Sequence, residues 1–191
     1  MPVKRVVVGV SGASSVTLAG EVLRSLKAFP DVETHLVMTP GAKRALKMES
    51  GDDPHVLQRE ADVVHAPDNL GAGIASGSFK TVGMMVVPCS MKTVAGIACG
   101  FSDNLLLRAA DVTIKEQRPL LLVPREAPLS TIHLENLLKL SKLPGVKIVP
   151  PLVNNYQRAG TVSELEHQIA LKLIEYLGFE CDERIRWSPT F

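Results

Sequence analysis

Short apolar runs separated by longer amphipathic stretches form a repeating pattern along the chain. The main runs cover Arg5 to Val10, Thr34 to Met38, Met84 to Val87, Leu120 to Val123 and Val146 to Val149. Runs of this length without an alternating polar face are typical of strands that are buried on both sides. A shorter strand is expected near Val63 and Val64, inside the least regular part of the chain, residues 50–77.

The stretches between these runs carry apolar residues at helical spacing. Leu18, Val22, Leu26 and Phe29 fall on one face of a helix that follows the turn at residues 12–15. Further helices are expected over about 42–49, 92–99, 104–115, 130–143 and 161–177. Strands that alternate with helices predict a parallel sheet with helices on both faces. The predicted fold class is α/β, a flavodoxin-like or Rossmann-like three-layer αβα sandwich.

Size and composition indicate one soluble globular domain over residues 1–191, which are 46% hydrophobic and 21% charged. The net charge of +1 argues against nucleic acid and against an anionic membrane surface as partners. No apolar stretch approaches the roughly 20 residues of a membrane span. The first residues lead directly into a strand, without room for a signal peptide, and the three cysteines lack zinc or CxxC spacing. A cytoplasmic protein is therefore expected.

The segment from Lys115 to Asn136 is the strongest candidate for an active site. Its apolar run ends at Pro124, and Arg125 and Glu126 follow before a second proline, Pro128. Ligands of open α/β sheets bind at the carboxyl ends of the strands, so charged side chains at this point are expected to carry chemistry. Glu126 is a candidate general acid–base, and a structural ion pair with Arg125 is the alternative.

The first strand ends in a turn rich in glycine and serine, GVSGASS, from Gly9 to Ser15. A dinucleotide site needs G-x-G-x-x-G, but serines occupy the second and third glycine positions, Ser11 and Ser14. An NAD site also carries an acid after the second strand, where this chain has Thr39. Both departures argue against NAD, and the hydroxyls suit a mononucleotide such as FMN. The alternative is a tight turn that binds no ligand.

A second polar turn, SMKTVAG, follows the strand that ends near Val87. Its Ser90 and Thr93 are candidates for bonds to a flavin or its phosphate, and an N-cap is the alternative function of Ser90. Cations near the central strand indicate a second phosphate site, with solvated or salt-bridged side chains as the alternative. These cations are Arg108, Lys115 and Arg125, together with Lys172 on the last helix.

Neither a catalytic triad nor a metal site is recognisable in the sequence. The only adjacent aspartates, Asp52 and Asp53, lie in a loop, so magnesium-dependent diphosphate chemistry is not expected. Glu49 is a second candidate carboxylate, with a position on a helix surface as its alternative. His133 is expected to pack or to cap a helix and not to act as a base.

Taken together, these stretches resemble the UbiX-type flavin prenyltransferases over nearly the whole chain. The motifs that carry the resemblance are SGAS (11–14), SGSF (76–79), PCSMKT (88–93), RAADV (108–112) and LVPREAPLSTIHLENLLKLS (122–141). The resemblance implies an enzyme that joins the dimethylallyl group of dimethylallyl monophosphate to N5 and C6 of reduced FMN. Its product, prenylated FMN, would serve a UbiD-type decarboxylase.

The resemblance also implies a metal-independent homo-oligomer, usually a dodecamer, with sites at subunit junctions. The tail from about residue 179 is expected to make oligomer contacts. FMN contacts are expected from Gly12, Ser14, Thr39, Ser90, Thr93 and Arg108. The dimethylallyl phosphate is expected to bind Lys115, Arg125, Tyr156 and Lys172. Catalytic roles fall to Glu126 as the acid–base, to Glu49 as a second glutamate, and to Ser14.

Three departures from the family pattern concern single positions. Ser15 stands where the family has the last glycine of GASG, which affects the turn. Thr39 replaces a serine and keeps the hydroxyl, and Lys172 replaces an arginine and loses the bidentate fork. The looser phosphate grip that this last change implies affects substrate affinity more than reaction type.

Two other functions remain open at this point. One is a flavin-dependent cysteine decarboxylase, although its histidine and substrate-clamp motifs have no obvious match here. The other is an FMN carrier or a non-catalytic subunit of a hydroxyarylic acid decarboxylase. The sequence leaves the recipient decarboxylase, the exact oligomer and the use of dimethylallyl diphosphate undecided.

Overall fold

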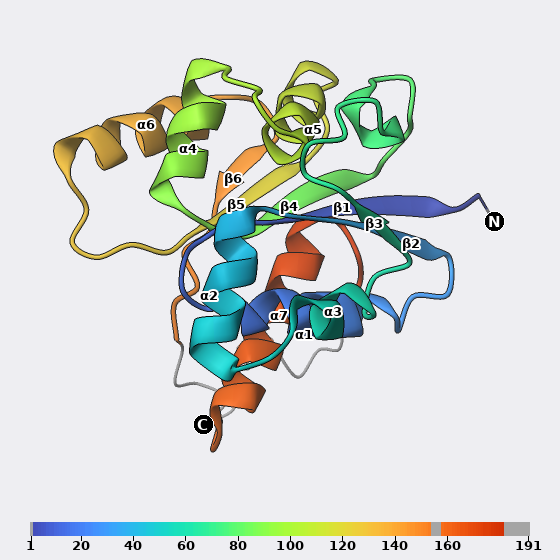
Figure 1. Cartoon of the computed structure of the whole chain (residues 1–191), viewed down its shortest axis with the longest axis vertical. Helices are drawn as coiled ribbons and strands as arrows, with labels where there is room; N and C mark the ends of the chain where they lie inside the picture. The colour runs from blue at the N-terminus through green and yellow to red at the C-terminus, as the bar shows by residue number, and fades with distance from the viewer. Residues whose placement is uncertain (1, 154–157, 182–191) are drawn as a thin grey trace, which may run out of the picture.

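A computed structural model describes residues 2–153 and 158–181, and its centre is a parallel sheet of six strands (Figure 1). The strands are β1 (Lys4–Val10), β2 (Val32–Met38), β3 (Val63–His65), β4 (Gly83–Cys89), β5 (Leu120–Pro124) and β6 (Val146–Ile148). Their order across the sheet is β3-β2-β1-β4-β5-β6, and every neighbouring pair is parallel. The α/β prediction is confirmed.

The strand order reverses between β1 and β4, so the two halves of the sheet are wound in opposite directions from this point. With all six strands the order is that of the Rossmann fold. Without the three-residue strand β3, the remaining five follow the flavodoxin order. The gap between the connections that leave β1 and β4 is where such sheets bind ligands.

Helices cover both faces of the sheet (Figure 1). One face holds α1 (Thr17–Leu26), α2 (Pro40–Ser50), α3 (Pro54–Gln58) and α7 (Val162–Tyr176). The other holds α4 (Met91–Cys99), α5 (Leu105–Lys115), α6 (Thr131–Ser141) and the short 3-10 helix η1 (Gly73–Ala75). Alternate residues of β1 serve the two cores, since Val6 and Val8 face the first layer and Val7 the second.

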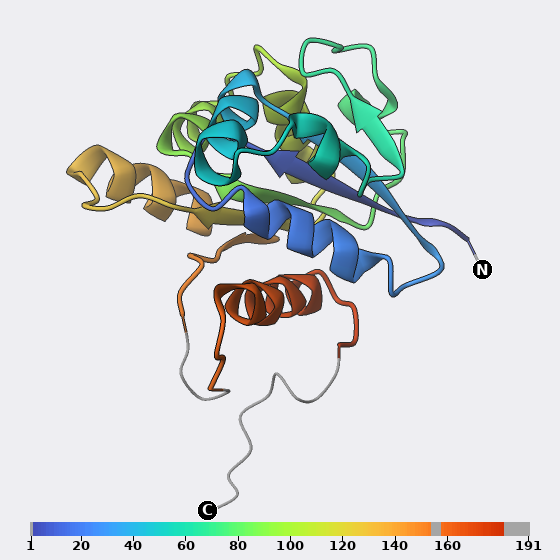
Figure 2. The same cartoon turned by 60° about the horizontal axis from the view of Figure 1, so that its bottom comes forward.

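The helices α1 and α7 lie side by side and run in the same direction (Figure 2). Thr17 at the start of α1 donates a hydrogen bond to Glu166, and Glu21 bonds His167 one turn further along. Beyond both helices, the rings of Phe29 and Phe179 lie 5.1 Å apart. The start of the C-terminal tail therefore packs on its own chain, and residues 182–191, for which oligomer contacts are predicted, lie outside the described part.

The irregular region contains two short helical segments that the apolar pattern does not indicate. The helix α3 has five residues and begins where the Asp53 carboxylate accepts a hydrogen bond from the His55 amide at 2.8 Å. Asp53 therefore acts as a helix cap. The helix α6 begins with a capping box, in which Ser130 and His133 bond each other's backbone amides. The capping function expected for His133 is confirmed.

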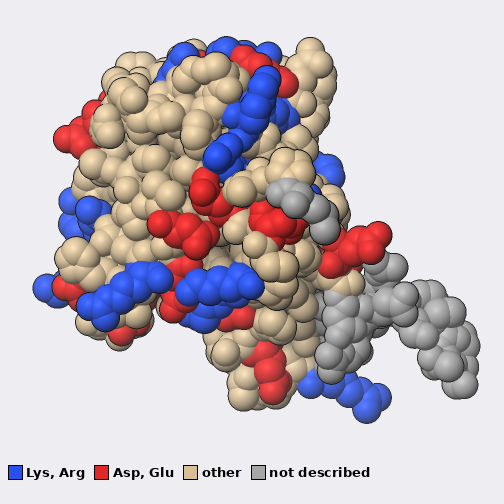
Figure 3. All heavy atoms as spheres, turned by 90° about the vertical axis from the view of Figure 1, so that its right-hand side faces the viewer, with Lys and Arg blue, Asp and Glu red and all other residues tan. Residues whose placement is uncertain are grey.

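Charges of both signs alternate over the face of the molecule shown in Figure 3, without a continuous basic region on that face. Among the described residues, no helix combines the length and the apolar character that crossing a membrane requires.

Candidate functional site

Three segments that follow neighbouring strands are bonded together at the carboxyl edge of the sheet. The buried Ser11 hydroxyl, just after β1, donates to the carbonyl of Pro88 at 3.1 Å and accepts from the amide of Ser90 at 2.8 Å. The amide of Arg125, just after β5, donates to the carbonyl of Cys89 at 3.3 Å. The first turn, the Ser90 turn and the Arg125–Glu126 segment therefore share one edge, as predicted.

A cavity of about 320 Å³ opens between the turns that follow β1, β2 and β4, beside the start of α5. This volume is within the range of small-molecule sites. Its walls combine hydroxyl and amide side chains, glycine backbone and two cations, with no carboxylate among the lining residues. The lining residues are Ser11, Gly12, Thr39, Pro40, Gly41, Arg44, Pro67, Ser90, Lys92, Thr93, Asn104 and Leu107.

Three helices begin at this cavity, and each is capped by a residue that lines it. Thr39 caps α2, Ser90 caps α4 and Asn104 caps α5, each accepting the amide hydrogen bond of the third residue that follows it. The remaining first-turn amides and the positive ends of the helix dipoles are the groups that bind anions at helix N-termini. Phosphate is therefore the ligand group that this cavity suits.

Gly12 allows the first turn to approach α2 closely. A Cβ atom at Gly12 would lie 3.0 Å from both the Cα and the carbonyl carbon of Gly41. This distance is shorter than nine in ten real Cβ contacts and the atoms met are backbone, so the two glycines permit the close contact that forms one wall of the cavity.

The next residues of the turn are held by a carboxylate from α2. Both oxygens of Glu49 accept from the Ser15 amide at 3.1 Å, and one also accepts from the Val16 amide at 3.1 Å. Ser15 has φ of 75°, a left-handed conformation that glycine adopts more easily, which explains the glycine usual at this position. The hydroxyl of the neighbouring Ser14 has no hydrogen-bond partner within the described part of the chain. Glu49 thus lies beside the predicted FMN turn and stabilises it.

Arg125 and Glu126 are both exposed where β5 ends. Glu126 accepts a hydrogen bond from the amide of Ala127 at 3.1 Å, and no ion pair joins it to Arg125. The alternative of a structural ion pair between these two residues is therefore not supported. Both side chains are available to a ligand at this edge.

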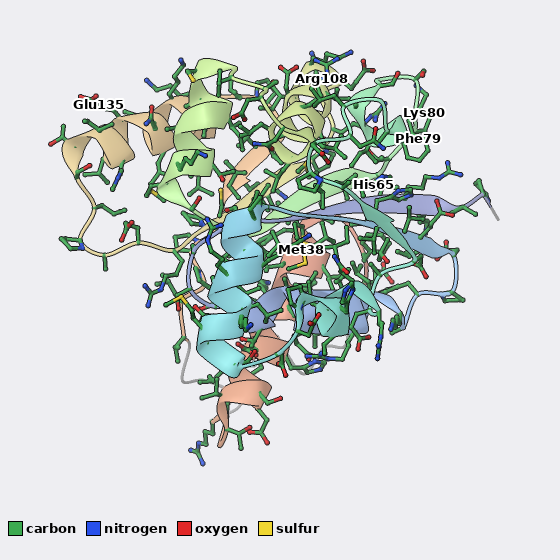
Figure 4. The ribbon with its side chains drawn as sticks, viewed as in Figure 1. Met38, His65, Phe79, Lys80, Arg108 and Glu135 are labelled. Atoms are coloured by element: carbon green, nitrogen blue, oxygen red, sulfur yellow. The ribbon has the colours of Figure 1, made fainter. Side chains whose placement is uncertain are left out.

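Arg108 points from α5 to the loop that contains the SGSF motif (Figure 4). Its Nε atom donates to the Ala75 carbonyl at 3.1 Å, and its Nη1 atom bonds Asp111 at 2.7 Å. Arg118 holds the same loop from its other end, through the carbonyls of Gly77 and Phe79. In the single chain Arg108 therefore anchors this loop and is not part of the cavity wall.

Lys115 and Lys172 lie toward the opposite edge of the sheet. The helix α5 runs from the cavity at Asn104 to Lys115, about 16 Å away at the helical rise, and the chain enters the amino end of β5 only five residues later. The ammonium of Lys115 bonds Glu116 at 2.7 Å, and this bond lowers the pKa of Glu116. Lys172 bonds Glu175 one turn before the end of α7. Within one chain these cations therefore do not gather with Arg125, and their contact with one phosphate at a subunit junction stays a prediction; Tyr156 lies outside the described residues.

The buried thiol of Cys89 has a raised pKa because burial disfavours its thiolate, so this cysteine is a core residue and not a nucleophile. Sequence reasoning missed three polar or charged side chains of the cavity: Arg44, Lys92 and Asn104. Each lies in or just before the first two turns of a helix, and that position was the available signal.

The family model described as Flavoprotein matches residues 1–170. "Flavin prenyltransferase LpdB" of Lactiplantibacillus plantarum is 49% identical over 97% of this chain and 98% of its own length. The crystal structure of a dodecameric, FMN-dependent UbiX-like decarboxylase from Escherichia coli O157:H7 is 45% identical, with a TM-score of 0.91 over 97% of this chain and all of that one. AnUbiX in complex with FMN and dimethylallyl pyrophosphate is 40% identical, with a TM-score of 0.92 over 99% of this chain and all of that one.

Proposed function

Because the chain belongs to the Flavoprotein family and, within it, to the UbiX-like flavin prenyltransferases, we propose that it prenylates reduced FMN with dimethylallyl monophosphate. The dimethylallyl group is joined to N5 and C6 of the flavin, and the product is prenylated FMN. The observation that carries the proposal is the bonding of the Ser11, Ser90 and Arg125 segments to one another at the switch point of the sheet.

The residues around the cavity fit FMN. Gly12 and Gly41 leave backbone exposed for close approach, and the capped starts of α2, α4 and α5 supply amides for a phosphate. Ser14, Thr39, Ser90 and Thr93 are the hydroxyl residues proposed to hold the flavin, with Arg108 fixing the adjacent loop. When bound, reduced FMN supplies the electron-rich atoms that accept the dimethylallyl group.

Arg125 is proposed to bind the phosphate of the prenyl donor. Its guanidinium stabilises the negative charge that grows on the phosphate as the C–O bond breaks. Glu126, the next residue, is proposed as the general acid–base that protonates the departing phosphate. Glu49 is proposed to serve the site from the other side, by fixing the turn that carries Ser14.

Completion of the donor site requires neighbouring subunits. Lys115 and Lys172 are too far along their helices to reach Arg125 in the same chain, so we propose that they, together with Tyr156, contact the phosphate bound to another subunit. The dodecameric relative supports an assembly of several subunits. The proposal further includes residues 1–191 as one domain and the C-terminal tail among the subunit contacts. AnUbiX binds the diphosphate, so the proposal includes dimethylallyl diphosphate as a second donor to be tested. A UbiD-type decarboxylase is the proposed recipient of the product.

The test is an anaerobic incubation with reduced FMN and dimethylallyl monophosphate, followed by mass spectrometry of the flavin. Glu126→Gln is expected to slow conversion by on the order of 10²-fold or more, as removal of a general acid–base does, with FMN affinity unchanged. Glu135→Gln, an equivalent change on the exposed surface of α6, is the control. Normal conversion by Glu126→Gln would remove Glu126 from the mechanism.

A further inference from the structure

Three charged residues at the end of α5 form one connected group. The helix ends in a Schellman motif, with Gln117 in a left-handed conformation (φ 54°) and the Arg118 amide bonded to the Thr113 carbonyl at 2.9 Å. This turn brings Arg118 back beside Glu116, with Nη2 3.7 Å from Oε2. The other oxygen of Glu116 accepts from the ammonium of Lys115 at 2.7 Å. The two oxygens of one carboxylate therefore face two different cations.

Arg118 is the fixed end of this group, and Lys115 is the free end. The side chain of Arg118 is only 12% exposed and donates to the carbonyls of Gly77 and Phe79 at 2.6 and 2.9 Å. Lys115 is about half exposed, and its ammonium lies at the end of a flexible four-carbon stem. Glu116 thus connects a mobile type of side chain to a guanidinium that the neighbouring loop holds in place.

Gly77 leaves the space that the ion pair occupies. A Cβ atom at Gly77 would lie 2.7 Å from Cδ of Glu116 and 2.8 Å from Nζ of Lys115, closer than real Cβ atoms approach other atoms. The backbone of Gly77 is not left-handed, so alanine fits the local conformation. Because the atoms it would meet are the ends of flexible side chains, alanine at this position would displace the ion pair and not the backbone.

We propose that Glu116 and Gly77 are positioning residues of the prenyl transfer, which hold the Lys115 ammonium where the donor phosphate of a neighbouring subunit meets it. This inference rests on the proposed function, in which Lys115 contacts that phosphate. A carboxylate beside a phosphate site weakens anion binding, so charge alone predicts that removing Glu116 strengthens donor binding. Positioning predicts a slower reaction instead, because a cation stabilises the charge that grows on the leaving phosphate only when it is held in place.

The experiment measures kcat and the KM for dimethylallyl monophosphate at saturating reduced FMN. Glu116→Gln and Gly77→Ala are each expected to lower kcat by on the order of tenfold, without a higher donor KM and with FMN affinity unchanged. Gly77→Ala is the sharper variant because it keeps every charge. In a Lys115→Gln background, Glu116→Gln should have no further effect, since the two residues act as one unit.

Two control variants match these changes and should leave kcat as in wild type. Glu135→Gln removes an exposed carboxylate on α6. Gly71→Ala adds the same methyl group at an exposed glycine, where the nearest atom it would meet, Oδ1 of Asn69, is at 3.4 Å.

Four results would overturn the inference. Unchanged kcat in both Glu116→Gln and Gly77→Ala would refute it and leave the proposed function intact. An equal loss of kcat from Glu116→Gln with and without Lys115 would mean that Glu116 does not act through that lysine. A parallel loss of FMN affinity and thermal stability would reduce both residues to maintenance of the fold. A wild-type protein that forms no prenylated flavin would contradict the proposed function, and the inference with it.

Discussion

Glu49 bonds the turn of the FMN site across 34 residues of sequence, and removing its carboxylate tests this geometry directly. The side chain accepts the Ser15 and Val16 amides, where α1 has no cap from a side chain of its own. Loss of a helix cap costs about 1 kcal/mol of stability. We expect no larger cost here because the Glu49 carboxylate is exposed and water screens its charge. Glu49→Ala should therefore lower the melting temperature of a chain of this size by about 2–4 °C.

The assay is denaturant and thermal unfolding at one fixed protein concentration, because the stability of an oligomer depends on concentration. Glu135→Ala is the matched control: it makes the same change in helix propensity on α6, where the Glu135 side chain points outward (Figure 4). The control should change stability by less than about 0.5 kcal/mol. Glu49→Gln, which keeps one acceptor oxygen, should fall between the two. Equal free energies of unfolding for Glu49→Ala and Glu135→Ala would refute the capping role of Glu49.

Three further predictions follow from single contacts. Ser15→Gly should raise the free energy of unfolding by about 0.5 kcal/mol. The change relieves about 1–2 kcal/mol of left-handed strain, which exceeds the cost of the added backbone entropy of the unfolded chain. A lower denaturation midpoint in this variant would contradict the prediction. A metal chelator should leave prenylation unchanged, because the proposed donor site meets the phosphate with Arg125, Lys115 and Lys172, and loss of turnover that magnesium restores would refute this. Burial and the neighbouring His35 lower the pKa of His65, so the unfolded chain binds a proton there more readily than the folded chain. The free energy of unfolding should therefore fall as the pH drops from about 7 to 5. His65→Gln should flatten that part of the stability profile, and an unchanged profile would exclude this cause.

The layers of the fold could be predicted from the sequence because its long strands are continuous apolar runs. The strand at Leu120–Pro124 is buried throughout, and its length and proline end match the prediction. The helix α3 was missed because five residues are too few to show a helical period, and only Asp53 and Pro54 marked its start.

The site was predicted where its residues follow strands closely, and less well elsewhere. Ser11, Ser90 and Arg125 lie within two residues of a strand end, so the parallel sheet brings them together. Lys115 and Lys172 come late in helices that run back across the sheet, and their distance from the carboxyl edge depends on helix length. The bond from Glu49 to Ser15 joins a helix end to a turn, and no local pattern in the sequence indicates it.

The reaction on which all the other proposals depend is that of reduced FMN with dimethylallyl monophosphate at the carboxyl edge of this sheet. Its most direct test is mass spectrometry of the flavin after anaerobic incubation of the protein with FMN, a reductant and isotope-labelled dimethylallyl monophosphate. We predict a flavin heavier than FMN by one labelled five-carbon unit, and much less of it with Arg125→Gln. Recovery of unmodified FMN from a protein that binds both ligands would contradict the claim and favour a flavin carrier.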